Sequence, residues 1–274
     1  MNKIILYYQT FKSLKPILQN PKYITHIHLS AIHFGLKNNK PYIHLNDYDP
    51  SDKIFNKVWV ELEEASQKGI KIILMIGGAG GAFINLFNNF DIYYNLLYKT
   101  IKKYPIICGV DLDIEEFVLL DNVKMLINRI DKDFGSKFII SMAPIQYSLE
   151  NDNPGLGGFI YKKLINSIEG KRINYLNGQF YGSYDLLSYD SVINNGYNDN
   201  IIVIGMLSDE YNDTTLDEIK KIKNKYNNFG GVYIWEYNDS PLNFGKSVYN
   251  IINKKKSCLR IIYQYFRKIC KKIY

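Results

Sequence analysis

The feature that most constrains the fold of this chain is a regular alternation of strand-like and helix-like segments along residues 1–253. Short runs rich in β-branched and aromatic residues are separated by stretches whose apolar residues recur at helical spacing. The strand-like segments are 4–8, 25–34, 70–76, 106–116, 137–143, 173–181, 201–207 and 230–235. Eight strands that alternate with helices over about 250 residues predict a single-domain α/β fold, a (β/α)8 TIM barrel.

The length and the hydrophobic content of the chain agree with that prediction. A chain of 274 residues that is 46% hydrophobic has ample core for one large α/β domain or two small ones. A doubly wound parallel sheet is the alternative, but no dinucleotide-binding fingerprint follows the first strand. We therefore expect one barrel domain over residues 1–253 and a separate segment over residues 254–274.

The fourth strand-like segment, 106–116, begins as a buried apolar strand and ends in a row of carboxylates. Alternate residues of a strand share a face. One face carries Gly109, Asp111, Asp113 and Glu115, and the other carries Cys108, Val110, Leu112 and Ile114. In a closed barrel the acidic face is interior, where carboxylates without partners are costly to bury. Because such barrels place their sites at the carboxyl ends of the strands, this segment predicts a catalytic site.

Two further patterns raise the question of a phosphate or metal ligand. Residues 77–81, a Gly-Gly-Ala-Gly-Gly turn after the third strand, lack the Lys-Ser/Thr pair of a P-loop and the spacing of a dinucleotide site. They favour a close approach of the backbone to a ligand above the strand end. His26 and His28 alternate with apolar residues, while His33 has the opposite parity. We interpret all three as core or loop histidines and expect no metal.

The formal net charge of +7 is concentrated at one end of the chain. Residues 254–274 hold 8 of the 34 basic residues and no acid, which leaves 26 basic residues against 27 acids in residues 1–253. The near-neutral body predicts no nucleic-acid-binding face. In the tail, apolar residues recur at spacings of 3 and 4: Leu259, Ile262, Phe266, Ile269 and Ile273. A basic amphipathic helix that binds an anionic membrane surface or an acidic partner is expected, with a helix packed on the barrel or a disordered tail as the alternatives.

Targeting signals are absent from the sequence pattern. No apolar run approaches the roughly 18 residues of a membrane span, and the apolar run near the N-terminus is too short for a signal peptide. Three cysteines, Cys108, Cys258 and Cys270, do not form a disulfide framework. We expect an intracellular protein or one exported by an unusual route, with membrane association through the basic tail.

The motifs at the strand ends resemble those of glycoside hydrolase family 18, the chitinases and their relatives. Residues 108–115 match that family's D-G-x-D-x-D-x-E signature at every position except the first, and residues 75–78 stand where the family has S-x-G-G. Further matches are Met142-Ala143-Pro144, Gln179-Phe180-Tyr181 and Trp235 at the ends of the fifth, sixth and eighth strands. The motifs occur in the same order as in the family, and the resemblance covers about residues 1–252.

The resemblance implies retaining hydrolysis of β-1,4-linked N-acetylglucosamine, in which the substrate's own acetamido oxygen is the nucleophile and no cofactor takes part. It assigns Glu115 as general acid and base, Asp113 as the group that orients the acetamido group and stabilises the oxazolinium, and Asp111 as the residue that shares a proton with Asp113. The remaining site residues would be Tyr181, which binds the acetamido oxygen; Trp235, the floor under the sugar; and Gln179, Met142, Gly77 and Gly78, which line the pocket. The first-strand partner of Asp111 would be Tyr7 or Tyr8.

Two departures from the family pattern lead to further expectations. Met75 stands where the family has a serine that bonds the inner aspartate, so we expect Asp111 to be poorly supported. Cys108 replaces the first acid of the motif, and its parity predicts a side chain that faces the helix layer. Glu116, which has the outward parity, is expected to be solvated.

Two other functions remain open from sequence. One is a chitinase-like lectin that binds carbohydrate with little or no catalysis, and the other is an endo-β-N-acetylglucosaminidase acting on the cores of N-glycans. Inactive relatives usually lose the glutamate or an aspartate, and the chain keeps both, which favours an enzyme. The short 207–214 connection leaves no room for an inserted domain, so an open, shallow groove is expected.

Overall fold

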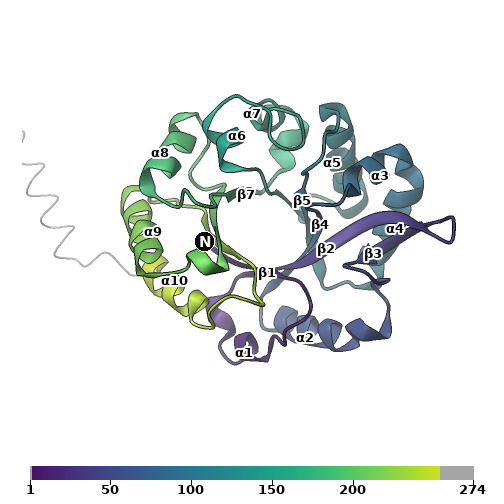
Figure 1. Ribbon diagram of the computed structural model, residues 1–274, viewed down its shortest axis with the longest axis horizontal. Coiled ribbons are helices and arrows are strands. Elements are labelled where there is room, and N and C mark those ends of the chain that lie inside the picture. The colour runs from purple at the N-terminus through teal and green to yellow at the C-terminus, as the bar shows by residue number, and fades with distance from the viewer. Residues whose placement is uncertain (1, 254–274) are drawn as a thin grey trace, which may run out of the picture.

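A computed structural model describes residues 2–253, which form a closed parallel β-barrel surrounded by helices (Figure 1). Its eight strands are β1 (Lys3–Tyr8), β2 (His26–Lys37), β4 (Lys71–Gly77), β5 (Ile107–Asp113), β6 (Ile139–Met142), β7 (Tyr175–Gln179), β8 (Ile202–Leu207) and β9 (Gly231–Trp235). The barrel closes because β1 pairs in parallel with both β2 and β9. The predicted (β/α)8 fold is confirmed.

The helices follow the strands around the outside of the barrel. The longer ones are α2 (Asn56–Gln67), α4 (Phe90–Lys103), α5 (Leu120–Phe134), α8 (Leu186–Asn194), α9 (Asp213–Lys225) and α10 (Phe244–Ile252). The short helices are α1 (Lys15–Leu18), α3 (Ala82–Asn88), α6 (Gln146–Glu150) and α7 (Tyr161–Ile165), with 3-10 turns η1 (Pro21–Tyr23), η2 (Lys53–Phe55), η3 (Glu169–Arg172) and η4 (Ser208–Glu210). The connection from β8 to α9 is as short as expected, since it contains only η4 and the two residues Tyr211 and Asn212.

One element outside the eight-fold pattern is β3 (Lys40–Leu45), which pairs antiparallel with the extended end of β2. The two strands form a hairpin that projects from the barrel (Figure 1). Its turn residues, Asn38 and Asn39, both have positive φ angles, 53° and 60°. Asparagine tolerates this left-handed conformation, which two-residue hairpin turns require.

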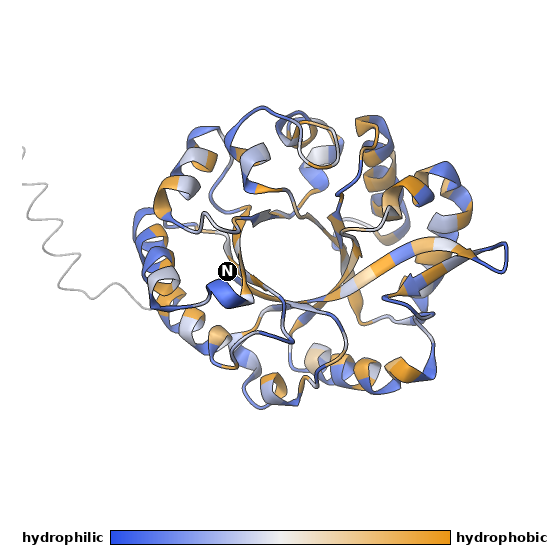
Figure 2. Ribbon diagram, viewed as in Figure 1, coloured by the Kyte–Doolittle hydropathy of each residue, from blue (hydrophilic) through white to orange (hydrophobic). Residues whose placement is uncertain are grey.

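Two apolar cores lie on the two sides of the barrel wall. The larger core lies between the strands and the helices, and the helices carry both hydrophobic and hydrophilic residues (Figure 2). The smaller core fills the barrel interior and consists of Ile5, Tyr7, Ala31, Ile73, Met75, Ile139, Tyr175, Val203 and Tyr233. Alternate residues of each strand pack into the outer core and the inner core, as the two-residue period of a strand requires.

The expectations for the basic tail, residues 254–274, lie outside the described residues. Within residues 2–253, no helix combines the length and the apolar character needed to cross a lipid bilayer.

Candidate active site

The three carboxylates that the sequence places on one face lie at the open, C-terminal end of β5. Asp111 is opposite Met75 of β4 and Asp113 is opposite Gly77, so both aspartates face the barrel interior. Asp111 is fully buried and Asp113 is 6% exposed. Glu115 follows the end of the strand and is partly exposed. The acids therefore form a line that runs from the barrel interior to solvent.

Asp111 is held by side chains from four other strands. The Tyr7 hydroxyl donates to Oδ2 at 2.7 Å, and the Ser141 hydroxyl donates to Oδ1 at 2.6 Å. The Asn177 amide donates to Oδ1 at 3.2 Å, and Nδ1 of His28 lies 3.2 Å from Oδ2. The expectation that Met75 leaves Asp111 poorly supported is wrong, because β1, β2, β6 and β7 supply the donors that β4 lacks.

These contacts separate the proton affinities of the two aspartates. Burial alone would raise the pKa of Asp111, but His28 and the hydrogen bonds from Ser141 and Tyr7 outweigh it and lower this pKa below its usual value. Asp113 has one side-chain contact, from Gln179 at 3.3 Å. Burial is the largest cause that raises its pKa well above the usual value, and the negative charges of Glu115 and Asp111 add to it. The shifts therefore keep Asp111 ionised at neutral pH and make Asp113 the aspartate that holds a proton more readily.

Gly77 and Gly78 bring the backbone of β4 against Asp113. The Gly78 amide donates to the Asp113 carbonyl at 2.8 Å. Gly77 has a φ of +95°, and a Cβ atom built on it would lie 2.2 Å from the Asp113 carbonyl oxygen and 2.6 Å from Phe83. Only glycine fits this position, because both the left-handed conformation and the close approach exclude a side chain. The glycine-rich turn therefore packs on Asp113.

Gln179 links the two outer carboxylates. Its Nε2 donates to the Ala143 carbonyl at 2.9 Å and lies 3.3 Å from Asp113 Oδ1 and 3.5 Å from Glu115 Oε1. The carbonyl contact fixes the amide with its donor group toward the acids. Gln179 thus lies beside the two outer carboxylates.

Aromatic side chains form the wall opposite β5. The Tyr233 hydroxyl donates to the Tyr181 hydroxyl at 3.1 Å, and burial raises the pKa of Tyr181, so this phenol stays protonated. Tyr233 lies over Gly205, where a Cβ atom would meet its ring at 1.8 Å. The Trp235 ring lies 5.4 Å from that of Tyr7, which in turn bonds Asp111. Tyr181 and Trp235 therefore lie beside the carboxylates, at the ends of β7 and β9.

Three expected orientations are wrong. Met142 is fully buried in the outer core and does not line the pocket, because Ser141 is the residue of β6 that faces inward. Cys108 packs on the inner core, since a register shift between Ile107 and Gly109 turns it inward at the end of the barrel remote from the carboxylates. Glu116 is not solvated, because its Oε1 accepts hydrogen bonds from the amides of Phe83 and Ile84 at the start of α3.

Sequence reasoning missed four residues that contact the site. His28, Ser141 and Asn177 contact Asp111, and Tyr233 positions Tyr181. Each has the inward parity of its strand, so a polar residue at an inward position was the available signal. Parity alone does not show which inward residues lie at the same height in the barrel.

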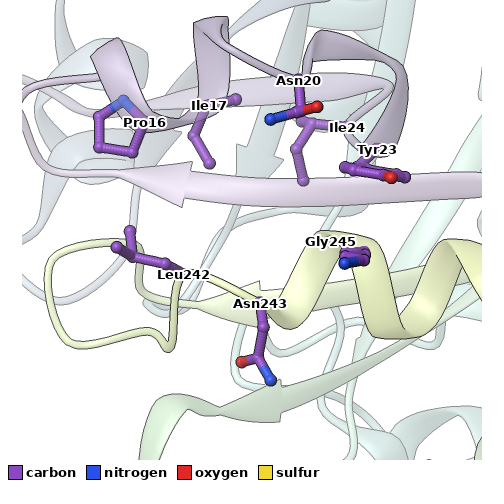
Figure 3. Close-up of a pocket in the computed structure, with 9 residues that line it drawn as sticks. Pro16, Ile17, Asn20, Tyr23, Ile24, Leu242, Asn243 and Gly245 are labelled. Atoms are coloured by element: carbon purple, nitrogen blue, oxygen red, sulfur yellow. The ribbon is translucent and has the colours of Figure 1, made fainter.

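One hollow lies near the strand ends, and another lies on the flank of the barrel. The first, of about 420 Å³, borders the glycine-rich turn and is lined by Phe11, His33, Phe34, His44, Asn46, Asp47, Ala79 and Gly80. The second, of about 270 Å³, lies between the α1–η1 segment and the start of α10 (Figure 3). None of the expected site residues lines the second hollow.

Comparison with known proteins links this geometry to a group of hydrolases. No protein-family model and no curated protein matches the chain. Among solved structures, a fungal endo-β-N-acetylglucosaminidase of glycosyl hydrolase family 18 is 28% identical, with a TM-score of 0.83 over 93% of this chain and 100% of that one. A chitinase from Aspergillus fumigatus is 27% identical, with a TM-score of 0.81 and full coverage of both chains. A family 18 chitinase from Pseudoalteromonas aurantia is 19% identical, with a TM-score of 0.71 over 90% and 99% of the chains.

The barrel and these neighbours define the class of the protein: it is a chitinase-like glycoside hydrolase. Within that class, the chain has the fold of glycoside hydrolase family 18.

Proposed function

We propose that the protein hydrolyses β-1,4-linked N-acetylglucosamine in chitin or chito-oligosaccharides, with retention of configuration and with the substrate's acetamido group as the nucleophile. The observation that carries this proposal is the line of three acids at the end of β5. Asp111 is buried and held by four side chains, Asp113 holds a proton more readily than Asp111, and Glu115 is partly exposed. Two carboxyl groups whose environments push their pKa values apart are typical of acid–base sites. The printed descriptions of the neighbouring structures, chitinases and an endo-β-N-acetylglucosaminidase, support this substrate class.

Glu115 is the acid that substrate reaches first. Its proton passes to the glycosidic oxygen as the bond to the sugar's C1 breaks, and the acetamido oxygen forms the new bond to C1. A water molecule then attacks C1, the bond between C1 and the acetamido oxygen breaks, and the water gives a proton to Glu115, which restores the acid and the acetamido group. Gln179, within 3.5 Å of both outer carboxylates, keeps Glu115 and Asp113 aligned.

The other side chains stabilise the positive oxazolinium intermediate. Asp113 faces the acetamido group, and when its proton passes to Asp111 it becomes a full negative charge beside the cation. The protonated Tyr181 hydroxyl is the donor for the acetamido oxygen, and Tyr233 holds it in place. Trp235 is the apolar floor under the sugar ring.

Glu115→Gln tests this assignment with a fluorogenic chito-oligosaccharide. The wild-type protein should release the fluorophore, and the variant should lose about 10²- to 10⁴-fold in kcat, the usual contribution of a general acid–base. The matched control is Glu116→Gln, because Glu116 is the next acid in the chain but contacts the start of α3. Turnover that survives in Glu115→Gln would remove Glu115 from this role.

An endo-β-N-acetylglucosaminidase acting on N-glycan cores is the second candidate, favoured by the 28% identity and the TM-score of 0.83 to such an enzyme. A glycopeptide with an intact N-glycan separates the two activities, because a chitinase leaves it whole while the endo-enzyme cuts within its chitobiose core. The third candidate, a lectin, predicts binding of both substrates and cleavage of neither.

A further inference from the structure

His28 is a fully buried, ionisable residue to which the proposed mechanism assigns no role. It lies on β2, opposite Tyr7 of β1 and Ile73 of β4, and faces the barrel interior. Nδ1 lies 3.2 Å from Asp111 Oδ2, and Nε2 lies 3.1 Å from the Tyr175 hydroxyl. Both ring nitrogens therefore meet buried polar groups, which a histidine kept only for packing does not need.

The two contacts decide where the ring carries its proton. A carboxylate only accepts hydrogen bonds, so the nitrogen that faces Asp111 must carry a hydrogen for the contact to be attractive. Tyr175 is almost fully buried, and burial raises its pKa well above the usual value, so its hydroxyl keeps a proton. A hydroxyl can both donate and accept, so the Tyr175 contact at Nε2 fits a neutral ring whose proton lies on Nδ1, the nitrogen that faces the carboxylate.

The β4 strand explains why this donor is needed. Met75 is the residue directly opposite Asp111, and a thioether has no hydrogen to donate. His28 reaches the same carboxylate from the neighbouring strand and contacts Oδ2, the oxygen that Tyr7 also binds. The contact is too bent for an ideal hydrogen bond, so its effect is chiefly that of a fixed dipole or charge beside the carboxylate.

We propose that His28 is a positioning residue, which turns its Nδ1–H toward Asp111 with Tyr175 behind it and so keeps Asp111 ionised and in place. The proposal rests on the proposed function for its kinetic consequence. In the resting site an ionised Asp111 holds the proton on Asp113, and the same ionised Asp111 accepts that proton when the intermediate forms. His28 therefore acts on the reaction through the two aspartates and never touches the sugar.

Other ionisable groups also face Asp111, and they set the background for any pH dependence. They are Tyr7 on β1, Tyr175 on β7, Tyr233 on β9, and Asp113 on the same strand. Burial raises the pKa values of these phenols well above the usual value, so they stay neutral across the working range of pH. These phenols therefore add no charge beside Asp111.

The proton position is measured first, by side-chain ¹⁵N NMR of the full-length protein, which has four histidines. The signal of His28 is assigned by its loss in His28→Asn. A proton on Nδ1, in the neutral ring or in the imidazolium, is the expected result. A neutral ring with its proton on Nε2 would overturn the proposal, and this measurement does not depend on any enzyme activity.

The second measurement is the pH–rate profile of kcat and of kcat/KM. His28→Leu should lower kcat roughly 10- to 100-fold, the range found when the partner that orients a reacting group is removed, with KM nearly unchanged. The acidic limb of the profile should move to higher pH, because Asp111 then protonates more readily. His28→Asn should restore most of the activity, since its amide can occupy the position of Nδ1. Tyr175→Phe, which removes one oxygen atom, should move the acidic limb in the same direction by less.

His26→Leu is the matched control, because His26 is another buried histidine of β2 that contacts the Tyr175 ring and Thr25. It should leave the acidic limb in place. The proposal fails if His28→Leu keeps the wild-type profile, if His28→Asn loses as much as His28→Leu, or if His26→Leu shifts the limb equally. If the wild type cleaves no N-acetylglucosamine substrate, the proposed function fails and the NMR result alone decides the role of His28.

Discussion

Removing the Tyr7 hydroxyl is the sharpest single perturbation of the buried carboxylate pair. Tyr7→Phe deletes the 2.7 Å hydrogen bond to Asp111 and the acceptor of the 2.9 Å hydrogen bond from Asn177. The ring remains, and with it the packing against Trp235 and His28, whose ring centroids lie 5.4 and 4.8 Å away. The substitution therefore tests the hydrogen bond and leaves the shape of the site unchanged.

The size of the effect follows from the chemistry of the bond. A buried hydrogen bond to a charged group contributes about 1.5–3 kcal/mol. Since about 1.36 kcal/mol corresponds to a tenfold change in proton affinity, the acidic limb of kcat should move up by about one to two pH units. The direction is fixed because the lost bond favours the ionised form of Asp111.

Stability should change with pH in a matching way. The pKa of Asp111 is lowered in the folded protein, so its ionisation stabilises the fold above the ordinary aspartate pKa of about 4, and this stabilisation is lost as the pH falls through the folded value. The cost of Tyr7→Phe in urea-induced unfolding should therefore be about 1.5–3 kcal/mol at pH 7 and smaller at pH 3.

Tyr8→Phe is the control for this experiment. Tyr8 is the adjacent residue, is equally buried, and packs in the outer core against Tyr237. It should leave the pH–rate profile where it is. An unchanged acidic limb in Tyr7→Phe, or an equal shift in Tyr8→Phe, would refute the assignment of Tyr7 as the partner that keeps Asp111 ionised.

Two further predictions concern the glycine-rich turn and the hollow beside it. Gly77→Ala should lower the unfolding free energy by roughly 2–5 kcal/mol, because the backbone there is left-handed and a side chain would clash with Asp113 and Phe83. Gly81→Ala is the control: its φ is also positive, +74°, but the space around it is open, so it should cost about 1–2 kcal/mol. Equal costs would contradict the close approach to Asp113. Phe11 is 72% exposed and lines the hollow that borders this turn. Phe11→Ala should raise KM about tenfold, or roughly 1.4 kcal/mol, for long chito-oligosaccharides but not for a disaccharide. Equal effects on both substrates would contradict a sugar-binding role for Phe11.

The alignment of the three acids could be predicted because it depends only on the period of a strand. Residues 111, 113 and 115 share a face in any extended segment, and the structure places Asp111 and Asp113 in the barrel interior. The resemblance offered Tyr7 or Tyr8 as one partner of Asp111, and Tyr7 is the one that bonds it. The other partners, Ser141 and Asn177, could not be predicted, because they lie 30 and 66 residues away in the sequence. Their convergence depends on how the barrel closes and on the stagger between strands, which local patterns do not contain.

Local irregularities account for the wrong orientations. A bulge lies between Ile107 and Gly109, and its one extra residue reverses the face of the strand residues that precede it. The predicted orientation of Cys108 assumed a regular strand at this point. Glu116 was placed by extending the strand beyond Asp113, its last residue, although the chain had already turned toward α3. Both errors come from applying a regular period at a strand end, which is where sites in this fold lie.

A barrel interior allows one strand to replace a donor that another strand has lost, and this affects how the mismatch at Met75 should be interpreted. Side chains from several strands reach Asp111 at the same height, so its hydrogen bonds can come from β1, β6 or β7, and a further polar contact from β2, without any change in the backbone. A position-by-position comparison registers the missing serine as a defect, because it examines β4 alone. The physical requirement is that the buried charge has enough donors, whichever strand supplies them. The departure at Met75 therefore does not argue against catalysis, and the compensating contact from His28 is the one to test.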